Sequence, residues 1–167
     1  APGFRWLHES FGTNWRMLEM QAVIGRIQLQ RMAGWTATRT RYAEQIWAAC
    51  RSHSALHVPE VPANVQHAHY KCYAYVRPEQ LAAGWNRDRI VAAINALGVP
   101  CYQGSCSEVY MEKAFDGTGW RPAAPLPTAH ALGTTSVMFL VHPTLTQAEV
   151  DTTCTAIAQV MQQATAA

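Results

Sequence analysis

The sequence has little charge and no cluster of one sign. Asp, Glu, Lys and Arg make up 14% of its 167 residues, and the formal net charge is +2. It contains no run of Lys or Arg and no basic stretch interleaved with aromatic residues, so nothing points to nucleic acid as a partner. It also lacks an apolar run of membrane-spanning length and a signal-peptide pattern. With 49% hydrophobic residues, the composition is that of one ordinary globular domain.

Cysteine is present, but not in the pattern of a metal site or a disulfide framework. The five cysteines are an odd number and form no C-x-x-C pair, which disfavours both a zinc ribbon and a set of disulfides. This usage predicts a reducing, cytoplasmic compartment. His67 and His69 form an H-x-H pair without an evident third ligand. We therefore predict no metal site and interpret the pair as solvated histidines at the entrance of a strand.

The most informative stretch that is present runs from Gly12 to Gln30. Its apolar residues recur at helical spacing, and they form a stripe too broad for a single exposed face. Thr13 and Asn14 are good N-cap types, so free backbone N–H groups should open in front of the helix and attract a phosphate. From spacing alone, a simple capping role is the favoured interpretation of Asn14.

The rest of the chain predicts a small layered α+β domain in which helices flank a small, mainly antiparallel sheet. A long helix is expected from about Thr13 to about Cys50, bent near Gly34, and its length suggests that it bridges two domains. The later elements are predicted from alternation, caps and breakers: strands at 69–76, 99–102 and 136–141, a helix after Asn86 that ends at Gly98, a short helix opened by an S-x-x-E capping box at 105–108, a helical turn near 128–132, and a helix opened by a second capping box at 146–149.

The stretch G-T-N-W-R-M-L-E-M-Q-A-V-I-G resembles the signature G-x-N-x-R-M-x-E-x-Q-A-A-I-G of the DegT/DnrJ/StrS sugar aminotransferases. These are pyridoxal-phosphate (PLP) enzymes of fold type I that act on nucleotide-linked keto sugars. The resemblance continues to the C-terminus and implies the C-terminal part of such an enzyme. It divides the chain into an exit segment from a large PLP domain (1–12), a connecting helix (13–50) and a small α/β domain (51–167).

The resemblance also implies roles for particular residues. Asn14 matches the residue that contacts the PLP phosphate of the neighbouring subunit in a homodimer. Arg16 serves the same anion or, on the alternative interpretation, a structural ion pair with a nearby glutamate. Tyr102, Gln103 and Ser105 follow a strand whose end approaches the sugar-nucleotide substrate, although Ser105 is equally explained as a helix cap. Many family members carry a His-Tyr pair here, so this chain departs from their pattern.

No catalytic residue is expected in the chain itself. Lys71 and Lys113 are its two lysines, and neither lies in the family's serine-to-lysine cofactor motif. The full enzyme is expected to use glutamate or glutamine to aminate a nucleotide-linked keto sugar for lipopolysaccharide, capsule or a related glycan. One alternative is a nucleotide-sugar dehydratase of the same family, in which His replaces the cofactor Lys. The other is a non-catalytic domain that binds a partner through an exposed aromatic surface.

Overall fold

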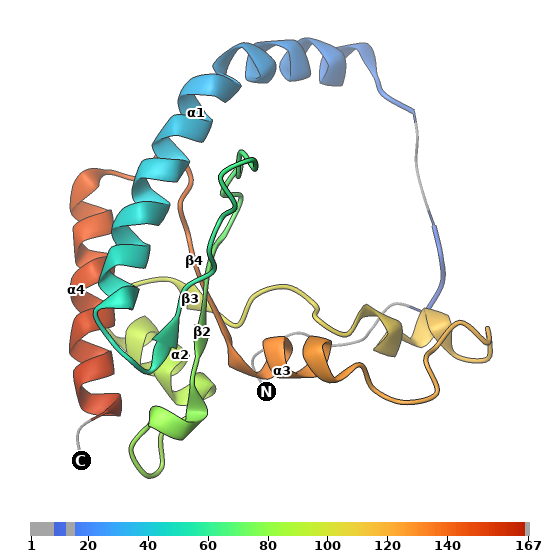
Figure 1. Cartoon of the computed structure of the whole chain (residues 1–167). Coiled ribbons are helices and arrows are strands. Elements are labelled where there is room, and N and C mark those ends of the chain that lie inside the picture. Colours follow the sequence, from blue (N-terminus) through green and yellow to red (C-terminus); the bar gives the residue numbers. More distant parts are fainter. Residues whose placement is uncertain (1–8, 13–15, 166–167) are drawn as a thin grey trace.

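The computed structural model of the chain describes residues 9–12 and 16–165 (Figure 1). Its α-helices are α1 (Glu19–Arg51), α2 (Arg87–Ala96), α3 (Pro127–Thr135) and α4 (Gln147–Ala164). Its strands are β1 (Leu56–His57), β2 (Cys72–Val76), β3 (Cys101–Tyr102) and β4 (Ser136–Phe139). The strands form one sheet in the order β1–β2–β4–β3, with every neighbouring pair antiparallel. This arrangement confirms the predicted α/β class with a small antiparallel sheet.

The core lies between one face of the sheet and the helices. Helices α1 and α2 contact the sheet, and α4 packs against both of them. Strand β2 shows why only one face is covered: Cys72, Ala74 and Val76 are buried in the core, whereas the two tyrosines between them are half-buried on the opposite face. Because side chains alternate along a strand, the sequence C-Y-A-Y-V fixes which face each residue takes.

Two helix starts confirm the caps predicted from the sequence. The Asn86 side chain accepts a hydrogen bond from the Arg89 N–H at 2.9 Å and caps α2. At the start of α4, the Thr146 hydroxyl accepts from the Glu149 N–H, and the Glu149 carboxylate accepts from the Thr146 N–H. These reciprocal bonds make the capping box that the T-x-x-E spacing predicts.

Several element boundaries differ from the prediction. Helix α1 begins at Glu19 rather than near Thr13, and the Leu18 N–H donates to the Gln21 side chain at 2.8 Å. Thr13 and Asn14 lie outside the described residues. Strand β1 was not predicted, because two residues are too few to show alternation. The predicted short helix after Ser105 is replaced by two single 3₁₀ turns, η2 (Val109–Met111) and η3 (Lys113–Phe115).

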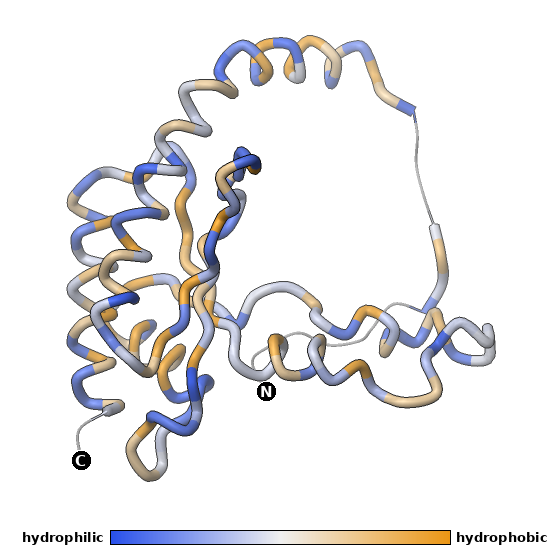
Figure 2. Tube along the Cα trace, in the orientation of Figure 1, coloured by the Kyte–Doolittle hydropathy of each residue, from blue (hydrophilic) through white to orange (hydrophobic). Residues whose placement is uncertain are grey.

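Helix α1 has two parts with different surroundings. Its C-terminal part packs in the core through residues such as Ile46 and Trp47. Its N-terminal part arches away from the sheet after a pronounced bend (Figure 1) and carries hydrophobic residues that no described element covers (Figure 2). Exposed large apolar side chains along and just before this part are Met17, Leu18, Met20, Val23, Ile24, Ile27, Leu29 and Met32. The predicted division of the chain into domains stays a prediction.

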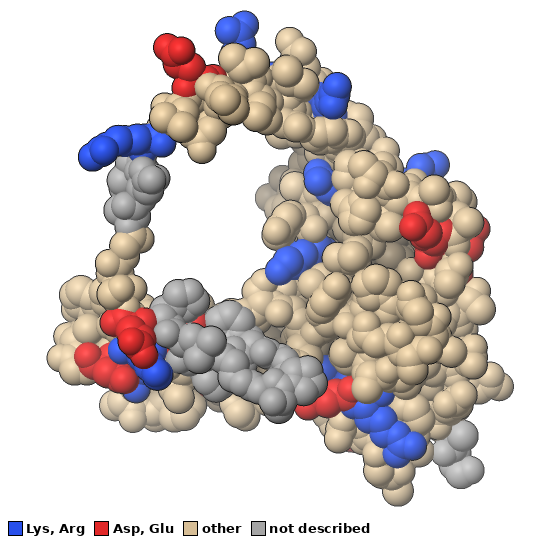
Figure 3. All heavy atoms as spheres, turned by 180° about the vertical axis from the view of Figure 1, so that it is seen from behind, with Lys and Arg blue, Asp and Glu red and all other residues tan. Residues whose placement is uncertain are grey.

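The segment before α1 lies against the loop that holds η3. Glu9 forms an ion pair with Lys113 at 2.9 Å, and the Phe11 ring packs edge-on against Phe115 with centroids 5.3 Å apart. Charged side chains are few elsewhere, and the face in Figure 3 shows them scattered rather than gathered in a patch of one sign. Among the described helices, none is both long and apolar enough to cross a membrane.

The H-x-H pair does not match the prediction of two solvated histidines. His67 is exposed, but His69 is only 3% exposed, has a positive φ of 45° and precedes β2 rather than lying in it. The His69 N–H donates to Nδ1 of His67 at 2.9 Å, and the His69 ring packs on Trp47 at 5.1 Å. Its own Nδ1 is buried without a hydrogen-bond partner. Burial, and then the neighbouring His67, lower the pKa of His69.

Replacing a core isoleucine should cost far more stability than replacing an exposed one. Ile157 on α4 is fully buried, whereas Ile24 on α1 is about half exposed. Ile157→Ala removes buried methyl groups and should lower the free energy of unfolding by roughly 2–4 kcal/mol. Ile24→Ala, the matched control, should change it by less than about 0.5 kcal/mol. Urea denaturation followed by circular dichroism measures both, and equal losses would contradict this description of the core.

The buried His69 should make the chain less stable as the pH falls through the neutral range. The unfolded chain takes up a proton near pH 6.5, whereas the folded chain, with its lowered His69 pKa, does so only at lower pH. The stability that neutral His69 contributes is therefore full well above the unfolded-state pKa and is lost as the pH falls below it. His69→Asn, which tolerates the left-handed backbone, should flatten this slope in urea titrations at several pH values.

The matched control for His69→Asn is His57→Asn. This change alters an exposed histidine on β1 and should keep the slope of the unsubstituted chain. If the two substitutions flatten the slope equally, the effect does not arise from the burial of His69.

Candidate functional site

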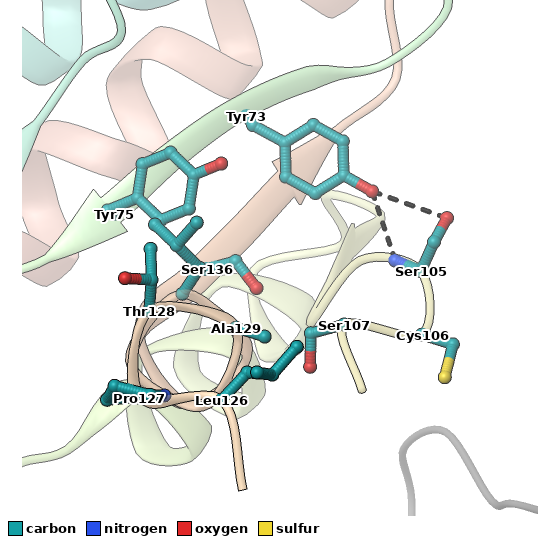
Figure 4. Close-up of a pocket in the computed structure, with 11 residues that line it drawn as sticks. Tyr73, Tyr75, Ser105, Cys106, Ser107, Leu126, Pro127, Thr128, Ala129 and Ser136 are labelled. Carbon is teal, nitrogen blue, oxygen red and sulfur yellow. Dashed lines mark hydrogen bonds between the residues drawn. The ribbon is translucent and has the colours of Figure 1, made fainter. Parts of the chain in front are cut away.

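A cavity lies on the open face of the sheet, opposite the core. It has a volume of about 650 Å³, within the range of small-molecule sites. Tyr73 and Tyr75 project into it from β2 (Figure 4). The opposite walls come from the loop between β3 and η2 and from the first turns of α3. The full lining is Tyr73, Tyr75, Ser105, Cys106, Ser107, Leu126, Pro127, Thr128, Ala129, Leu132 and Ser136. Hydroxyl groups are thus the main polar groups of this cavity.

The loop that follows β3 is held against Tyr73. The Ser105 N–H donates to the Tyr73 hydroxyl at 3.0 Å, and that hydroxyl lies 3.4 Å from the Ser105 Oγ (Figure 4). Lys71 directly precedes β2 and donates from Nζ to Ser105 Oγ at 2.7 Å. Ser105 is therefore no helix cap, because its backbone and side chain are both bound to β2 and the residue preceding it.

Gly104 permits this close approach of the loop to the strand. Its φ is +104°, and a Cβ at this position would lie 2.6 Å from Cε1 of Tyr73. Any side chain here would therefore need both an unfavourable backbone conformation and a shift of the Tyr73 ring. The glycine places the Ser105 hydroxyl at the rim of the cavity.

Arg87 at the start of α2 fixes the far end of the cavity. Its guanidinium donates to the backbone carbonyls of Gly133 and Ser136, at 3.0 and 2.9 Å, and so joins α2 to the end of α3. The Ser136 hydroxyl donates to the Gln103 carbonyl at 2.7 Å. These bonds connect β4, α3 and the loop after β3 into one frame.

A carboxylate network closes the side of the loop next to α3. The Tyr110 hydroxyl donates to Glu108 at 2.6 Å, and His130 on α3 lies 3.2 Å from the other carboxylate oxygen. The Leu126 N–H in turn donates to the Tyr110 hydroxyl at 2.9 Å. The hydrogen bond from Tyr110, and then that from His130, lower the pKa of Glu108. Tyr110 and Glu108 thus fix the chain that leads into α3.

A second, smaller cavity lies on the same face of the sheet and shares Tyr73 and Tyr75 with the first. Its volume is about 280 Å³. The remaining lining residues are Trp47, Pro59, Glu60, Val61, Pro62, Val65, His67 and Lys71. The first cavity presents several hydroxyl groups, whereas this one combines ring-bearing and aliphatic walls with the ionisable side chains of Glu60, His67 and Lys71. Burial raises the pKa of Tyr75, which lines both cavities.

The structure places the predicted site residues in different surroundings. Asn14 lies outside the described residues, and Arg16 is exposed shortly before α1. Of the predicted substrate contacts, only Ser105 lines the large cavity. The Gln103 side chain donates to Asp88 at 2.6 Å, and Tyr102 is exposed on β3 opposite Met138. The assignment of these residues to cofactor and substrate stays a prediction.

Sequence reasoning missed Lys71, Tyr73 and Tyr75 as site residues. The signal was available, because the alternation in β2 already placed these residues on one face and the small apolar residues on the other. The loop contacts that give them a function join residues more than 30 positions apart, as in the 34-residue separation of Lys71 and Ser105. Such pairings do not follow from the spacing of either segment.

The surroundings of the two lysines bear on whether this chain could supply the Schiff base of a PLP site. Such a site needs a lysine for the Schiff base and a carboxylate for the pyridine nitrogen. Lys113 is paired with Glu9 at the protein surface, and Lys71 is bound to Ser105 with no carboxylate partner among the described residues. The buried thiols of Cys50 and Cys101 have pKa values raised by burial to about 12, so they offer no activated nucleophile. No described group of three or more His, Cys, Asp or Glu residues is arranged to hold a metal ion.

Adding a methyl group at Gly104 should disturb the loop more than adding one at another glycine of positive φ. Gly104→Ala forces both backbone strain and a clash with Tyr73, whereas Gly117→Ala, at φ +70°, meets no atom within 4 Å. Both should lose about 1 kcal/mol to backbone strain. Gly104→Ala should lose on the order of 1–3 kcal/mol more through overpacking, measured by urea denaturation. Equal losses would show that the contact with Tyr73 carries no energetic weight.

Comparisons with a protein-family model and with solved structures both identify aminotransferases as the proteins that this chain resembles. The model of the DegT/DnrJ/EryC1/StrS aminotransferase family matches residues 2–158. The solved structure of the aminotransferase from Psychrobacter cryohalolentis is 57% identical, with a TM-score of 0.84, and the match covers 98% of this chain and 44% of that one. No curated protein matches the chain.

More distant structures share the fold. The S. venezuelae DesV, solved in complex with a ketimine intermediate, is 20% identical with a TM-score of 0.74, covering 95% of this chain and 40% of that one. The 3-amino-5-hydroxybenzoic acid synthase is 20% identical with a TM-score of 0.72, covering 96% and 43%. The chain thus spans less than half the length of each of these three relatives. The family model matches nearly the whole chain, which confirms the resemblance seen in the sequence: the chain belongs to the DegT/DnrJ/EryC1/StrS aminotransferase family.

Proposed function

We propose that this chain is part of a PLP-dependent aminotransferase that aminates a nucleotide-linked keto sugar. The observation that carries the proposal is the 57% identity to the Psychrobacter aminotransferase over 98% of this chain. The amino donor in this proposal is glutamate, and the product enters lipopolysaccharide, capsule or a related glycan. The enzyme works as a cytoplasmic homodimer. The Schiff-base lysine comes from residues outside this chain, since neither Lys71 nor Lys113 has the surroundings of such a residue.

In this proposal the segment before α1 faces the cofactor phosphate of the neighbouring subunit. Asn14 donates from its side-chain amide, and Arg16 adds a guanidinium close to the start of α1. The first turn of a helix carries partial positive charge, which favours a phosphate there. The contacts of Glu9 and Phe11 with the η3 loop, described above, hold the chain just upstream of these residues.

The large cavity provides the substrate side of the proposed site. Ser105 stands at its rim, and the hydroxyls of Tyr75 and Thr128 offer both donors and acceptors to a sugar. The Ser136 hydroxyl, whose O–H donates to the Gln103 carbonyl, offers an acceptor. Gln103 and Tyr102 lie at the edge of this region, with the Gln103 amide already engaged by Asp88. Their contribution is therefore secondary to that of Ser105.

A non-catalytic interaction domain is a second candidate, and one observation favours it. Eight large apolar side chains along and before the N-terminal part of α1 are at least 44% exposed, more than a typical monomer leaves in one place. In the aminotransferase proposal, this surface is covered by the rest of the enzyme. In the alternative, it binds an unrelated partner.

The first test is the coding sequence upstream of Ala1, read in frame. A large domain with a lysine in the cofactor motif supports the aminotransferase, and a histidine there supports the dehydratase. A start codon directly before Ala1 supports the interaction domain. The full-length gene product is then assayed with glutamate, PLP and UDP- or dTDP-linked keto sugars; absence of amino-sugar product with every one of them would overturn the proposed activity.

Asn14→Ala should weaken cofactor binding by the full-length product. Loss of a hydrogen bond to a charged phosphate costs about 1.5–3 kcal/mol, which corresponds to roughly a 10- to 100-fold rise in the Kd for PLP. Equilibrium titration of the apoenzyme with PLP, followed by the cofactor absorbance, gives this constant. Gln162→Ala removes an exposed amide on α4 and serves as the control, with an unchanged Kd. An unchanged Kd for Asn14→Ala would leave Asn14 without a cofactor role.

A further inference from the structure

Lys71 stands at the boundary between the two cavities on the open face of the sheet. The cavities share Tyr73 and Tyr75, so they lie on either side of these two rings. Lys71 lines the smaller cavity, and its Nζ donates to Ser105 Oγ, which lines the larger one. A ligand that occupies both cavities therefore passes close to the Lys71 ammonium.

The charge of Lys71 is not neutralised by the protein. It forms no ion pair with any carboxylate that the structure describes, and its Nζ contacts the Ser105 hydroxyl and the face of the Tyr70 ring, whose centroid lies 5.5 Å away. Glu60 lines the same small cavity but does not pair with it. An ammonium has three donors, so two remain for a ligand. This is the arrangement expected for an anion contact.

The two cavities differ in the chemistry that they offer. The larger one presents the hydroxyls of Ser105, Ser107, Thr128 and Ser136, which suit the hydroxyl groups of a sugar. The smaller one is walled by ring-bearing and apolar residues such as Pro59, Val61 and Tyr73, which suit the flat face of a base. A cavity that presents hydroxyl groups and a cavity with ring-bearing walls, with one unpaired cation between them, match a sugar and a base joined by an anionic linker.

We propose that Lys71 binds the diphosphate of a nucleoside diphosphate sugar, with the sugar in the larger cavity and the nucleoside in the smaller one. The inference rests on the proposed function, because it takes a nucleotide-linked sugar as the substrate. It adds to that function the residue that recognises the diphosphate, and it states which cavity holds the sugar and which holds the nucleoside. Ser105 is then a positioning residue as well, since its hydroxyl accepts from Nζ and holds the ammonium between the cavities.

A purely structural role for Lys71 makes a different prediction. If Lys71 served only to hold the Ser105 loop, its loss would weaken binding of uridine and of UDP alike. If it binds the diphosphate, its loss affects UDP and spares uridine, which carries no phosphate. The ratio of the two affinities therefore separates the roles, and it does not depend on turnover.

The experiment uses the full-length gene product and its Lys71→Gln, Lys71→Arg and Lys113→Gln variants. Lys113 is the matched control because it is the other lysine, is paired with Glu9 and lines neither cavity. Calorimetric titrations with UDP, dTDP and uridine give the affinities. We expect Lys71→Gln to weaken the better-bound nucleoside diphosphate by about 10- to 100-fold, the range for a charge-assisted hydrogen bond. Uridine should change less than about twofold, Lys71→Arg should recover most of the loss, and Lys113→Gln should bind normally.

The outcomes keep this inference apart from the proposed function. Equal losses for UDP and uridine, or no loss for either diphosphate, would overturn the role of Lys71. So would a wild-type protein that binds neither UDP nor dTDP more tightly than uridine. The proposed activity has its own readout, conversion of the cofactor by glutamate without any sugar. Absence of that half-reaction from the wild-type protein would count against the aminotransferase rather than against Lys71.

Discussion

The antiparallel pairing of β2 with β4 is the constraint on which the rest of the structure depends. The register joins Tyr73 to Met138 and Tyr75 to Ser136, so both strands turn the same alternate positions away from the core. Helices α1 and α2 take up the other face, where Cys72, Ala74 and Val76 are small enough for close packing. A slip of one residue would exchange the two faces and bury the tyrosines and Lys71. The candidate site is therefore a consequence of how the core is packed.

Local signals predicted the fold well where the interactions that form each element are local. The Asn86 cap, the Thr146–Glu149 box and the alternation in β2 all involve residues within a few positions of one another, and the structure confirms each. The S-x-x-E motif at Ser105 failed for the opposite reason. Its serine had a competing partner in Lys71, 34 residues away, and this tertiary contact replaced the cap. The candidate site consists mostly of such distant pairings, so its composition could not be predicted from the sequence.

The surroundings of α1 explain why the sequence predicted the family more readily than it predicted what this chain does. The signature residues at its start were recognisable as a pattern, but they belong to a helix whose N-terminal part finds no partner among the described residues. A helix of this kind gains little from propensity alone and depends on packing for its stability. The match covers 44% of the Psychrobacter structure, and in the proposed aminotransferase the remainder of the enzyme covers this part of α1. In the same proposal, the cofactor site beside the start of α1 is shared with other parts of the enzyme and is not built by this chain alone.

The scarcity of lysine strengthens the argument for a diphosphate contact at Lys71. A chain with only two lysines uses one in an ion pair at the surface and keeps the other between two cavities, where it pairs with no carboxylate that the structure describes. If Lys71 served only to hold the loop after β3 in place, a neutral hydrogen-bond donor could replace it, because Ser105 Oγ needs only one N–H. The ammonium provides that bond and retains a full charge on the face where the cavity with hydroxyl groups meets the cavity with ring-bearing walls. The position of this charge between the two cavities is what favours a diphosphate in our proposal.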